Sequence, residues 1–268
     1  MSRIAVAATA PFGADVLERL ARRHEVTALL TRPDAPRGRG LRRGSPPAKE
    51  AAERLGIPVL QPERPTAGLE LGAPVVVVCA YGLLVPEELL GERLWLNVHP
   101  SLLPRWRGAA PVERAVLAGD TETGVTIHET VAALDAGPIA AQEAFAIAPD
   151  DDAGAVYARA AEVAVRLLDS VLAAPDRATF VPQAADGVTY ADKLTAADRL
   201  LDLRRPAGEL VRRVHALSPH VGARAELRGR PVTVWRARVA PDGSFEPLEV
   251  QPDGGRRMEY GAWLRGLR

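Results

Sequence analysis

The chain has 268 residues, of which 47% are hydrophobic, so it can form one large domain or a domain with a smaller one beside it. Its 34 basic and 34 acidic side chains balance, which excludes a protein that is positively charged over its whole surface. Any nucleic-acid-binding surface therefore has to be a local patch. The single cysteine, Cys79, excludes an intramolecular disulfide, and no apolar run reaches the length of a membrane span, so we expect a soluble cytoplasmic protein.

The first elements of the chain predict a parallel sheet. Residues 4–8 and 25–31 have the apolar character of buried strands, and residues 12–22 between them carry apolar side chains at helical spacing. A strand, a helix and a strand in so few residues are typical of a βαβ unit. The turn at residues 8–13 lacks the pattern G-x-G-x-x-G, which argues against a dinucleotide cofactor.

Residues 32–49 form a strongly basic segment, with five arginines and one lysine against the single acid Asp34. Its many prolines and glycines predict a loop. Guanidinium groups suit contacts with the phosphates and bases of an RNA end. An ordinary solvated loop would have the same composition, so the residues alone leave both interpretations open. The basic side chains are Arg32, Arg37, Arg39, Arg42, Arg43 and Lys49.

An amide and an imidazole follow a predicted strand in the middle of the chain. Residues 75–80 are uniformly apolar, as in a central parallel strand buried on both faces. Residues 94–96 predict the end of the next strand, and Asn97 and His99 follow directly. Side chains two residues apart on a strand point the same way, so these two should lie side by side. Prolines then force a fixed loop at the carboxyl end of the strand, where open α/β sheets place their ligand sites.

A carboxylate follows a later strand. Residues 123–130 predict a strand, and residues 134–137 predict a tight turn that carries Asp135. With Asn97 and His99, this acid suits attack of an amine on a carbonyl carbon: the amide and a protonated imidazole stabilise the oxyanion, and the carboxylate accepts the proton of the amine. A carboxylate beside the imidazole would also raise the pKa of His99. Taken singly, each of the three residues would more often be structural.

Other polar residues give weaker signals. The acids at 150–152 suit the start of a helix better than a metal site. The remaining histidines show no metal-ligand spacing, so we predict structural or surface positions for His24, His128, His215 and His220.

The second half of the chain predicts the end of one domain, a linker and a smaller domain. An extended run at residues 138–148 precedes a long amphipathic helix at residues 152–172. Further elements are expected as helices at 206–217 and 260–267 and as strands at 222–227, 232–237 and 246–251. The predicted boundaries are 1–184 for the first domain, 185–202 for the linker and 203–268 for the second domain.

Several stretches resemble the folate-dependent formyltransferases. The likeness is carried by residues 97–111, 119–120, 123–127 and 134–137. Its most specific part is Ser-Leu-Leu-Pro-Arg-Trp-Arg-Gly-Ala-Ala-Pro at residues 101–111. The likeness covers nearly the whole chain and is greatest to those members that formylate charged initiator tRNA. Within this extended signature, Asn97, His99 and Asp135 are expected to be catalytic.

The resemblance implies an α/β fold with two parts. The first is a Rossmann-like, mostly parallel sheet with helices on both faces. The second is a small C-terminal β-barrel of the oligonucleotide-binding type. The stretch between Arg238 and Gln251 is too short for the usual number of strands. We therefore expect an abbreviated barrel.

The resemblance also implies the ligands. The cosubstrate would be 10-formyltetrahydrofolate, without a metal or a nucleotide cofactor. The implied folate-binding residues are Tyr81, Gly82, Leu83, Leu84, Val85, Ser101, Leu102, Leu103 and Pro104. For Leu83, Leu84 and Val85 the residues alone leave ordinary core open as the alternative. The residues implied for the acceptor stem of initiator methionyl-tRNA are Arg37, Arg39, Arg42, Arg43 and Lys49. Arg39 occupies the position that wedges into the mismatched first pair of the stem in that family.

The expected function is transfer of a formyl group from 10-formyltetrahydrofolate to the α-amine of methionine on initiator tRNA, by a monomeric enzyme of translation initiation. The alternatives are a formyltransferase acting on a small amine such as an amino-sugar nucleotide, a hydrolase of the formyl-folate, and a non-catalytic RNA-binding homologue. The basic segment favours tRNA, whereas the abbreviated barrel keeps the acceptor open.

Overall fold

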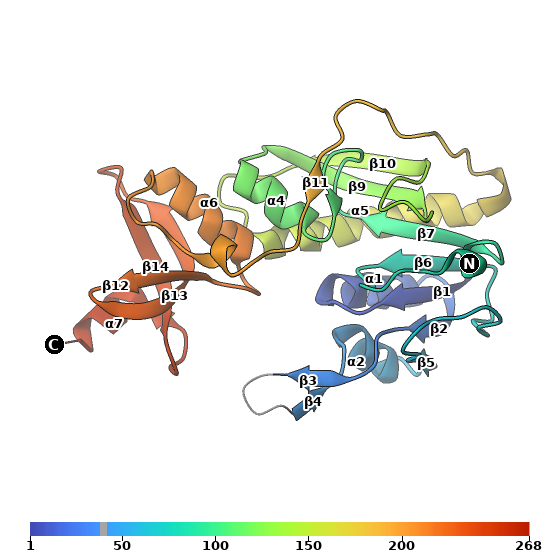
Figure 1. Cartoon of the computed structure of the whole chain (residues 1–268), viewed down its shortest axis with the longest axis horizontal. Coiled ribbons are helices and arrows are strands. Elements are labelled where there is room, and N and C mark those ends of the chain that lie inside the picture. Colours follow the sequence, from blue (N-terminus) through green and yellow to red (C-terminus); the bar gives the residue numbers. More distant parts are fainter. Residues whose placement is uncertain (38–41, 268) are drawn as a thin grey trace. The chain divides into compact units, whose positions relative to one another are not determined.

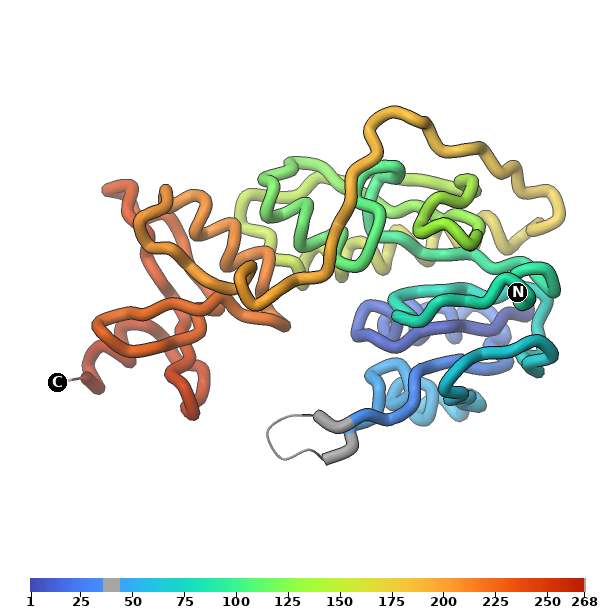
Figure 2. The backbone as a smooth tube through the Cα atoms, viewed as in Figure 1, coloured from blue at the N-terminus to red at the C-terminus, as the bar shows by residue number. Residues whose placement is uncertain are grey.

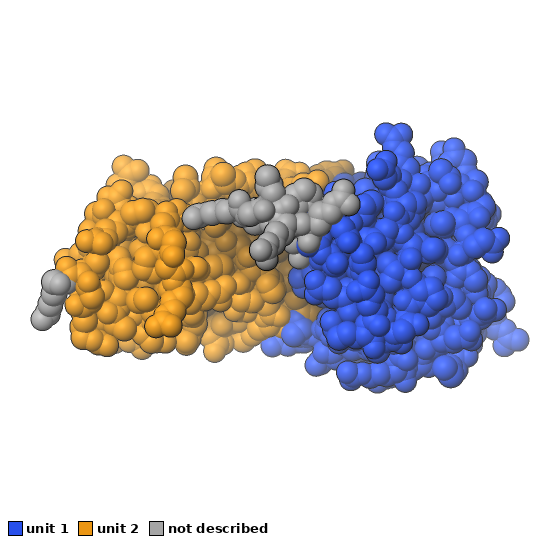
Figure 3. All heavy atoms as spheres, turned by 90° about the horizontal axis from the view of Figure 1, so that it is seen from below, with its two compact units in different colours: residues 1–107, 124–144, 158–189 blue, residues 108–123, 145–157, 190–268 orange. Residues whose placement is uncertain are grey.

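The computed structural model describes the backbone of residues 1–37 and 42–267. The chain forms two compact units, drawn in blue and orange in Figure 3. Unit 1 comprises residues 1–107, 124–144 and 158–189, and unit 2 comprises residues 108–123, 145–157 and the chain from Tyr190 onward. Each unit draws on three segments, so the continuous domains expected from the sequence stay a prediction.

Unit 1 is built on a seven-stranded sheet with the order β10-β9-β7-β6-β1-β2-β5 (Figure 1). The pairs β1–β2, β1–β6, β2–β5 and β6–β7 are parallel, whereas β7–β9 is antiparallel. This arrangement confirms the predicted mostly parallel sheet. Its strands are β1 (Arg3–Ala8), β2 (Glu25–Leu30), β5 (Val59–Leu60), β6 (Val75–Cys79), β7 (Leu94–His99), β9 (Glu122–Glu129) and β10 (Ile139–Ala146).

Helices lie on both faces of this sheet, as predicted. On one face, Val76 and Val78 of β6 pack with Leu89 and Trp95 in a buried cluster. On the other, the first helix approaches so closely that a side chain at Gly13 would meet the carbonyl oxygen of Cys79. The helices are α1 (Pro11–Ala21), α2 (Pro47–Arg54), α3 (Glu87–Leu90) and α5 (Ala153–Ala173, whose first turn belongs to unit 2), followed by the 3-10 turn η1 (Pro175–Arg177).

The basic segment expected as a loop contains a two-stranded ribbon. Strand β3 (Ala35–Arg37) pairs antiparallel with β4 (Arg42–Gly44), and Arg37 stands opposite Arg42. The prediction of a loop is wrong at these positions, because a proline on the outer edge of an isolated ribbon disturbs no ladder of hydrogen bonds. Three of the arginines predicted to contact RNA, Arg37, Arg42 and Arg43, therefore lie on regular strands.

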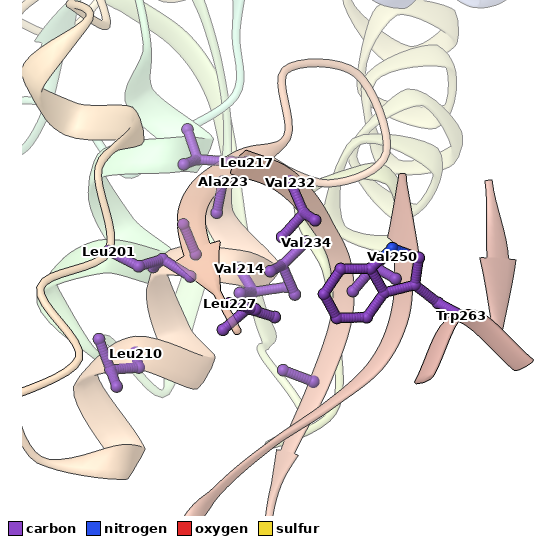
Figure 4. Close-up of a cluster of buried hydrophobic side chains, with 12 residues drawn as sticks. Leu201, Leu210, Val214, Leu217, Ala223, Leu227, Val232, Val234, Val250 and Trp263 are labelled. Carbon is purple, nitrogen blue, oxygen red and sulfur yellow. The ribbon is translucent and has the colours of Figure 1, made fainter. Parts of the chain in front are cut away.

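Unit 2 contains an antiparallel sheet in the order β12-β13-β14-β15. Leu210 and Val214 pack with Val232, Val234 and Trp263 in its core (Figure 4). This confirms a small C-terminal β domain. Its elements are α4 (Pro111–Ala118), η2 (Ala197–Arg199), α6 (Ala207–Leu217), β12 (Ala223–Leu227), β13 (Arg230–Val239), β14 (Phe245–Pro252), β15 (Met258–Glu259) and α7 (Tyr260–Arg265). A separate small sheet joins β8 (Arg107–Gly108) to β11 (Tyr190–Ala191).

Within the part of the chain that the structure describes, no helix combines the length and the apolar character needed to cross a membrane.

Candidate active site

The carboxyl end of β7 carries the predicted amide and imidazole. His99 is its last residue and is 4% exposed, and Asn97 precedes it by two positions. Strand β6 runs parallel to β7, so both strands end at the same edge of the sheet. The antiparallel neighbour β9 places His128 directly opposite Asn97.

Asp135 reaches the same place from the turn that follows β9. The Nδ2 atom of Asn97 donates to Oδ1 of Asp135 at 3.0 Å, and Nδ1 of His99 lies 3.7 Å from Oδ2. The side chains of His99 and Asp135 are 5% and 9% exposed. The structure therefore brings together all three residues predicted to be catalytic, in a place largely withdrawn from water.

His128, which we did not predict as part of the site, lies within it. Its Nδ1 is 2.8 Å from the carbonyl oxygen of Glu129, which can only accept, so Nδ1 carries the hydrogen. Its Nε2 is then free to accept a hydrogen bond from Nδ2 of Asn97, at 3.2 Å. The amide of Asn97 is thus oriented with its NH₂ group between His128 and Asp135. No pattern in the sequence indicates this contact, because it depends on the register of a distant strand.

His99 is held in one protonation pattern. Its Nε2 lies 2.8 Å from the carbonyl oxygen of Trp106, so Nε2 donates and Nδ1 is the ring atom that faces Asp135. Burial lowers the pKa of His99 below its ordinary value of 6.5, although Asp135 and the Trp106 carbonyl both act to raise it. Our expectation of a raised pKa is therefore wrong in its net direction, because the sequence does not show how deeply the ring is buried.

This lowered pKa predicts a pH dependence of stability. Between the folded pKa of His99 and 6.5, the unfolded chain binds more protons than the folded chain, so this contribution to stability falls as the pH falls through that window. The free energy of unfolding, measured by urea titration at about pH 7.5 and about pH 5.5, should fall more for the wild type than for His99→Gln. An equal fall in both proteins would contradict the burial effect.

The turn that presents Asp135 depends on a glycine. Gly137 lies so close to the end of β9 that a Cβ atom there would meet the carbonyl oxygen of Glu129. That carbonyl also accepts the hydrogen bond from His128, so the turn, the strand end and the imidazole are packed as one group.

Gly137→Ala should therefore destabilise the fold by about 3 kcal/mol, because the neighbour it strikes is backbone. Thermal and urea unfolding would measure the effect. Gly208→Ala in α6 is the matched control, since its added Cβ would have only the Arg212 Nη1 atom nearby, at 3.7 Å. If both variants unfold like the wild type, the tight packing of the turn is refuted.

The first segment expected to bind folate, residues 81–85, follows β6 at the same sheet edge. Tyr81 is 2% exposed, and its hydroxyl has no hydrogen-bond partner among the described residues. Burial raises the pKa of Tyr81 to about 12. Leu83 and Val85 pack partly against the buried cluster, whereas Gly82 is exposed and Leu84 is 83% exposed. Gly82 and Leu84 are thus the positions in this segment that a ligand can reach without a rearrangement.

The second folate segment, residues 101–104, is mostly turned inward. Ser101 is fully buried and its hydroxyl donates to the carbonyl of Arg105. Leu103 is 3% exposed, its N–H donates to Thr126, and its carbonyl accepts from Gln142. Leu102 and Pro104 are half-buried. Ser101 and Leu103 therefore hold the loop in place through hydrogen bonds on its buried side. A folate contact by this segment stays a prediction.

The residues expected to bind tRNA divide into two groups. Arg37, Arg42 and Arg43 lie on the β3–β4 ribbon, and Arg39 lies outside the described residues. Lys49 is paired instead: its Nζ lies 2.9 and 2.8 Å from the two carboxylate oxygens of Asp34, with 16% of its side chain exposed. This ion pair ties the base of the ribbon to α2.

No group of three or more His, Cys, Asp and Glu side chains among the described residues could hold a metal ion. Cys79 is fully buried, and burial raises the pKa of its thiol, so it is not poised as a nucleophile.

Comparisons with known proteins show which family the chain resembles. Residues 2–172 match the family model described as Formyl transferase, and residues 193–247 match Formyl transferase, C-terminal domain. The chain is 39% identical to methionyl-tRNA formyltransferase of Alcanivorax borkumensis, with 98% of this chain and 91% of that protein covered. It is 40% identical to the protein of the same name from Cereibacter sphaeroides, with 96% and 93% covered.

Solved structures share the fold at low sequence identity. HypX from Aquifex aeolicus in complex with tetrahydrofolic acid matches with a TM-score of 0.70 and 19% identity, covering 98% of this chain and 47% of that one. An N-formyltransferase from Helicobacter canadensis, in complex with folinic acid and dTDP-3-aminofucose, matches with a TM-score of 0.68 and 16% identity, covering 90% and 88%.

Proposed function

The chain belongs to the formyl transferase family, and on that premise we propose that it transfers the formyl group of 10-formyltetrahydrofolate to the α-amine of methionine on initiator tRNA. The single observation that carries this proposal is the convergence of Asn97, His99 and Asp135 at the carboxyl edge of the sheet. The printed names of the relatives, and their similarity over nearly the whole chain, support this acceptor.

The reaction joins the amine nitrogen to the formyl carbon and breaks the bond from that carbon to N10 of the folate. Asp135 accepts the proton that the amine loses, since its carboxylate is the acid–base group nearest to both other residues. That proton is returned to the departing N10. Atoms and charge therefore balance without a metal ion or a redox cofactor.

Asn97 and His99 stabilise the oxygen of the tetrahedral intermediate. In the structure Nδ2 of Asn97 donates to Asp135 and His128, so the oxyanion would replace one of these acceptors. Nε2 of His99 is committed to the Trp106 carbonyl, which leaves Nδ1 as the atom that can take up a proton and donate it. At 3.7 Å from Nδ1 the Asp135 carboxylate is beyond hydrogen-bond distance, and its negative charge favours the protonated ring electrostatically.

The acceptor can be tested directly. Purified protein and 10-formyltetrahydrofolate would be mixed with charged initiator tRNA, with a charged methionyl-tRNA that lacks the mismatched first pair, or with a dTDP-amino sugar. We expect formylation of the initiator tRNA alone. Formylation of the sugar and not of the tRNA would replace this proposal with the amino-sugar alternative, and release of formate without an acceptor would indicate a hydrolase.

The β3–β4 ribbon provides a variant for the tRNA contact. Arg37 and Arg42 stand opposite each other on its two strands. The double variant Arg37→Ala/Arg42→Ala should weaken tRNA binding and lower the dependence of log Kd on log salt by about 2, or about 1 for each lost phosphate contact. Its KM for the folate should not change. Arg22→Ala, an exposed arginine outside the ribbon, is the control; equal effects of the two variants would refute the contact.

A further inference from the structure

A strap of chain, residues 181–189, follows η1 in the sequence and leads to β11 (Figure 2). It is fixed at both ends. Val181 exchanges backbone hydrogen bonds with Ile139, at 2.7 and 2.9 Å. At the other end, Thr189 accepts from Trp106 N–H through its hydroxyl at 2.8 Å and from Arg107 N–H through its carbonyl at 2.9 Å. The strap thus contacts the same loop whose Trp106 carbonyl holds His99.

One side chain in the mostly exposed part of this strap, residues 181–187, turns toward the site. Gln183 is half-buried between exposed neighbours. Its Nε2 donates to the carbonyl oxygens of Asp135 at 2.7 Å and Gly137 at 2.8 Å. Its Oε1 accepts from Nη2 and Nε of Arg107 at 2.6 and 3.1 Å. A guanidinium can only donate, so Arg107 fixes which end of the amide faces the turn.

The hydrogen bonds from Gln183 stabilise a turn that has an unfavourable backbone conformation. Asp135 has a φ of +46°, in the left-handed region that residues other than glycine seldom occupy. Where its carboxylate points depends on keeping that backbone conformation. Gln183 binds the carbonyl of Asp135 itself and the one two residues later, so it holds the turn at the strained position and directly after it.

We propose that Gln183, oriented by Arg107, is a positioning residue that keeps the Asp135 carboxylate at hydrogen-bond distance from Asn97 and beside His99. Gln183 does not touch the reacting atoms and acts only through Asp135. The inference rests on the proposed function for its kinetic consequences, whereas its structural consequence can be measured without any substrate.

The kinetic experiment uses Gln183→Met, which keeps the side-chain length and removes both donors. We expect kcat for formyl transfer to fall roughly 10- to 100-fold, as for a misplaced catalytic group, while KM for both substrates stays within about twofold. In the Asp135→Asn background the same substitution should cost little more, because its target is already lost. Thr27→Val, which also removes side-chain bonds to two carbonyls in unit 1, those of Ile4 and Leu71, should leave kcat unchanged.

The structural experiment follows the His99 ring by NMR across a pH titration, with His99→Gln used to assign its signals. The Asp135 carboxylate raises the pKa of His99. Gln183→Met should therefore move the His99 midpoint to lower pH, in the same direction as Asp135→Asn, and Thr27→Val should not move it.

An unchanged kcat, an unchanged His99 midpoint, or an equal fold loss of kcat in the Asp135→Asn background would each overturn the role of Gln183. If the wild type formylates no methionyl-tRNA, the proposed function fails, and the titration alone still decides whether Gln183 positions Asp135.

Discussion

Asp135→Asn should lower kcat for formyl transfer roughly 10²- to 10⁴-fold, the range for removal of a general base. The substituted amide can still accept the hydrogen bond that Asn97 now gives to Oδ1 at 3.0 Å, so the geometry of the site should persist. The amide cannot take a proton from the amine, and it cannot stabilise a charge on His99. The loss should therefore appear in kcat, with KM for the folate and the tRNA nearly unchanged.

Single-turnover formylation, with unfolding measured alongside, would check this result. Asp169→Asn is the matched control, because Asp169 also pairs with a buried histidine, His24, at 2.9 Å, but outside the site. The control should keep wild-type turnover. Near-native turnover by Asp135→Asn would remove the carboxylate from the mechanism.

His99→Ala should lower kcat roughly 10²- to 10³-fold, the cost of removing one preorganised donor to an oxyanion. The structure adds a second consequence. The Trp106 carbonyl would lose its donor at 2.8 Å in a buried place, so the variant should also be less stable than the wild type.

The two effects are separable by comparison with His24→Ala, which empties another buried histidine position in unit 1. Both variants should unfold more easily, but only His99→Ala should lose turnover at a temperature where it is fully folded. If the losses of turnover are equal, or if neither variant loses any, His99 has no catalytic role.

The parts of this site that follow local rules could be predicted from the sequence. The alternation of side chains along a strand put Asn97 and His99 together, and the uniformly apolar residues 75–79 marked the central strand beside them. The acids before α5 were correctly assigned to a helix start, since Asp152 accepts from the N–H of Ala155 at 2.9 Å.

The parts that depend on distant pairing or on depth could not be predicted. His128 enters the site through the register of β9 against β7. Gln183 enters it from a strap that lies 48 residues after Asp135 in the sequence. The direction of the His99 pKa follows from burial, which composition does not reveal. The ribbon at β3–β4 was missed because proline and glycine indicate a loop unless the edge of a strand accommodates them.

We propose that Asn97, His99 and Asp135 together move a formyl group to the methionyl amine of initiator tRNA, and this proposal can be tested in one experiment. Its most direct measurement mixes the protein with 10-formyltetrahydrofolate labelled in the formyl carbon and with charged initiator tRNA, and then follows the label for one turnover. We expect labelled formylmethionine on the tRNA with the wild type and, over the same time, bound but unreacted substrates with Asp135→Asn. Label that stays on the folate with the wild type, or that is transferred equally well by Asp135→Asn, would contradict it.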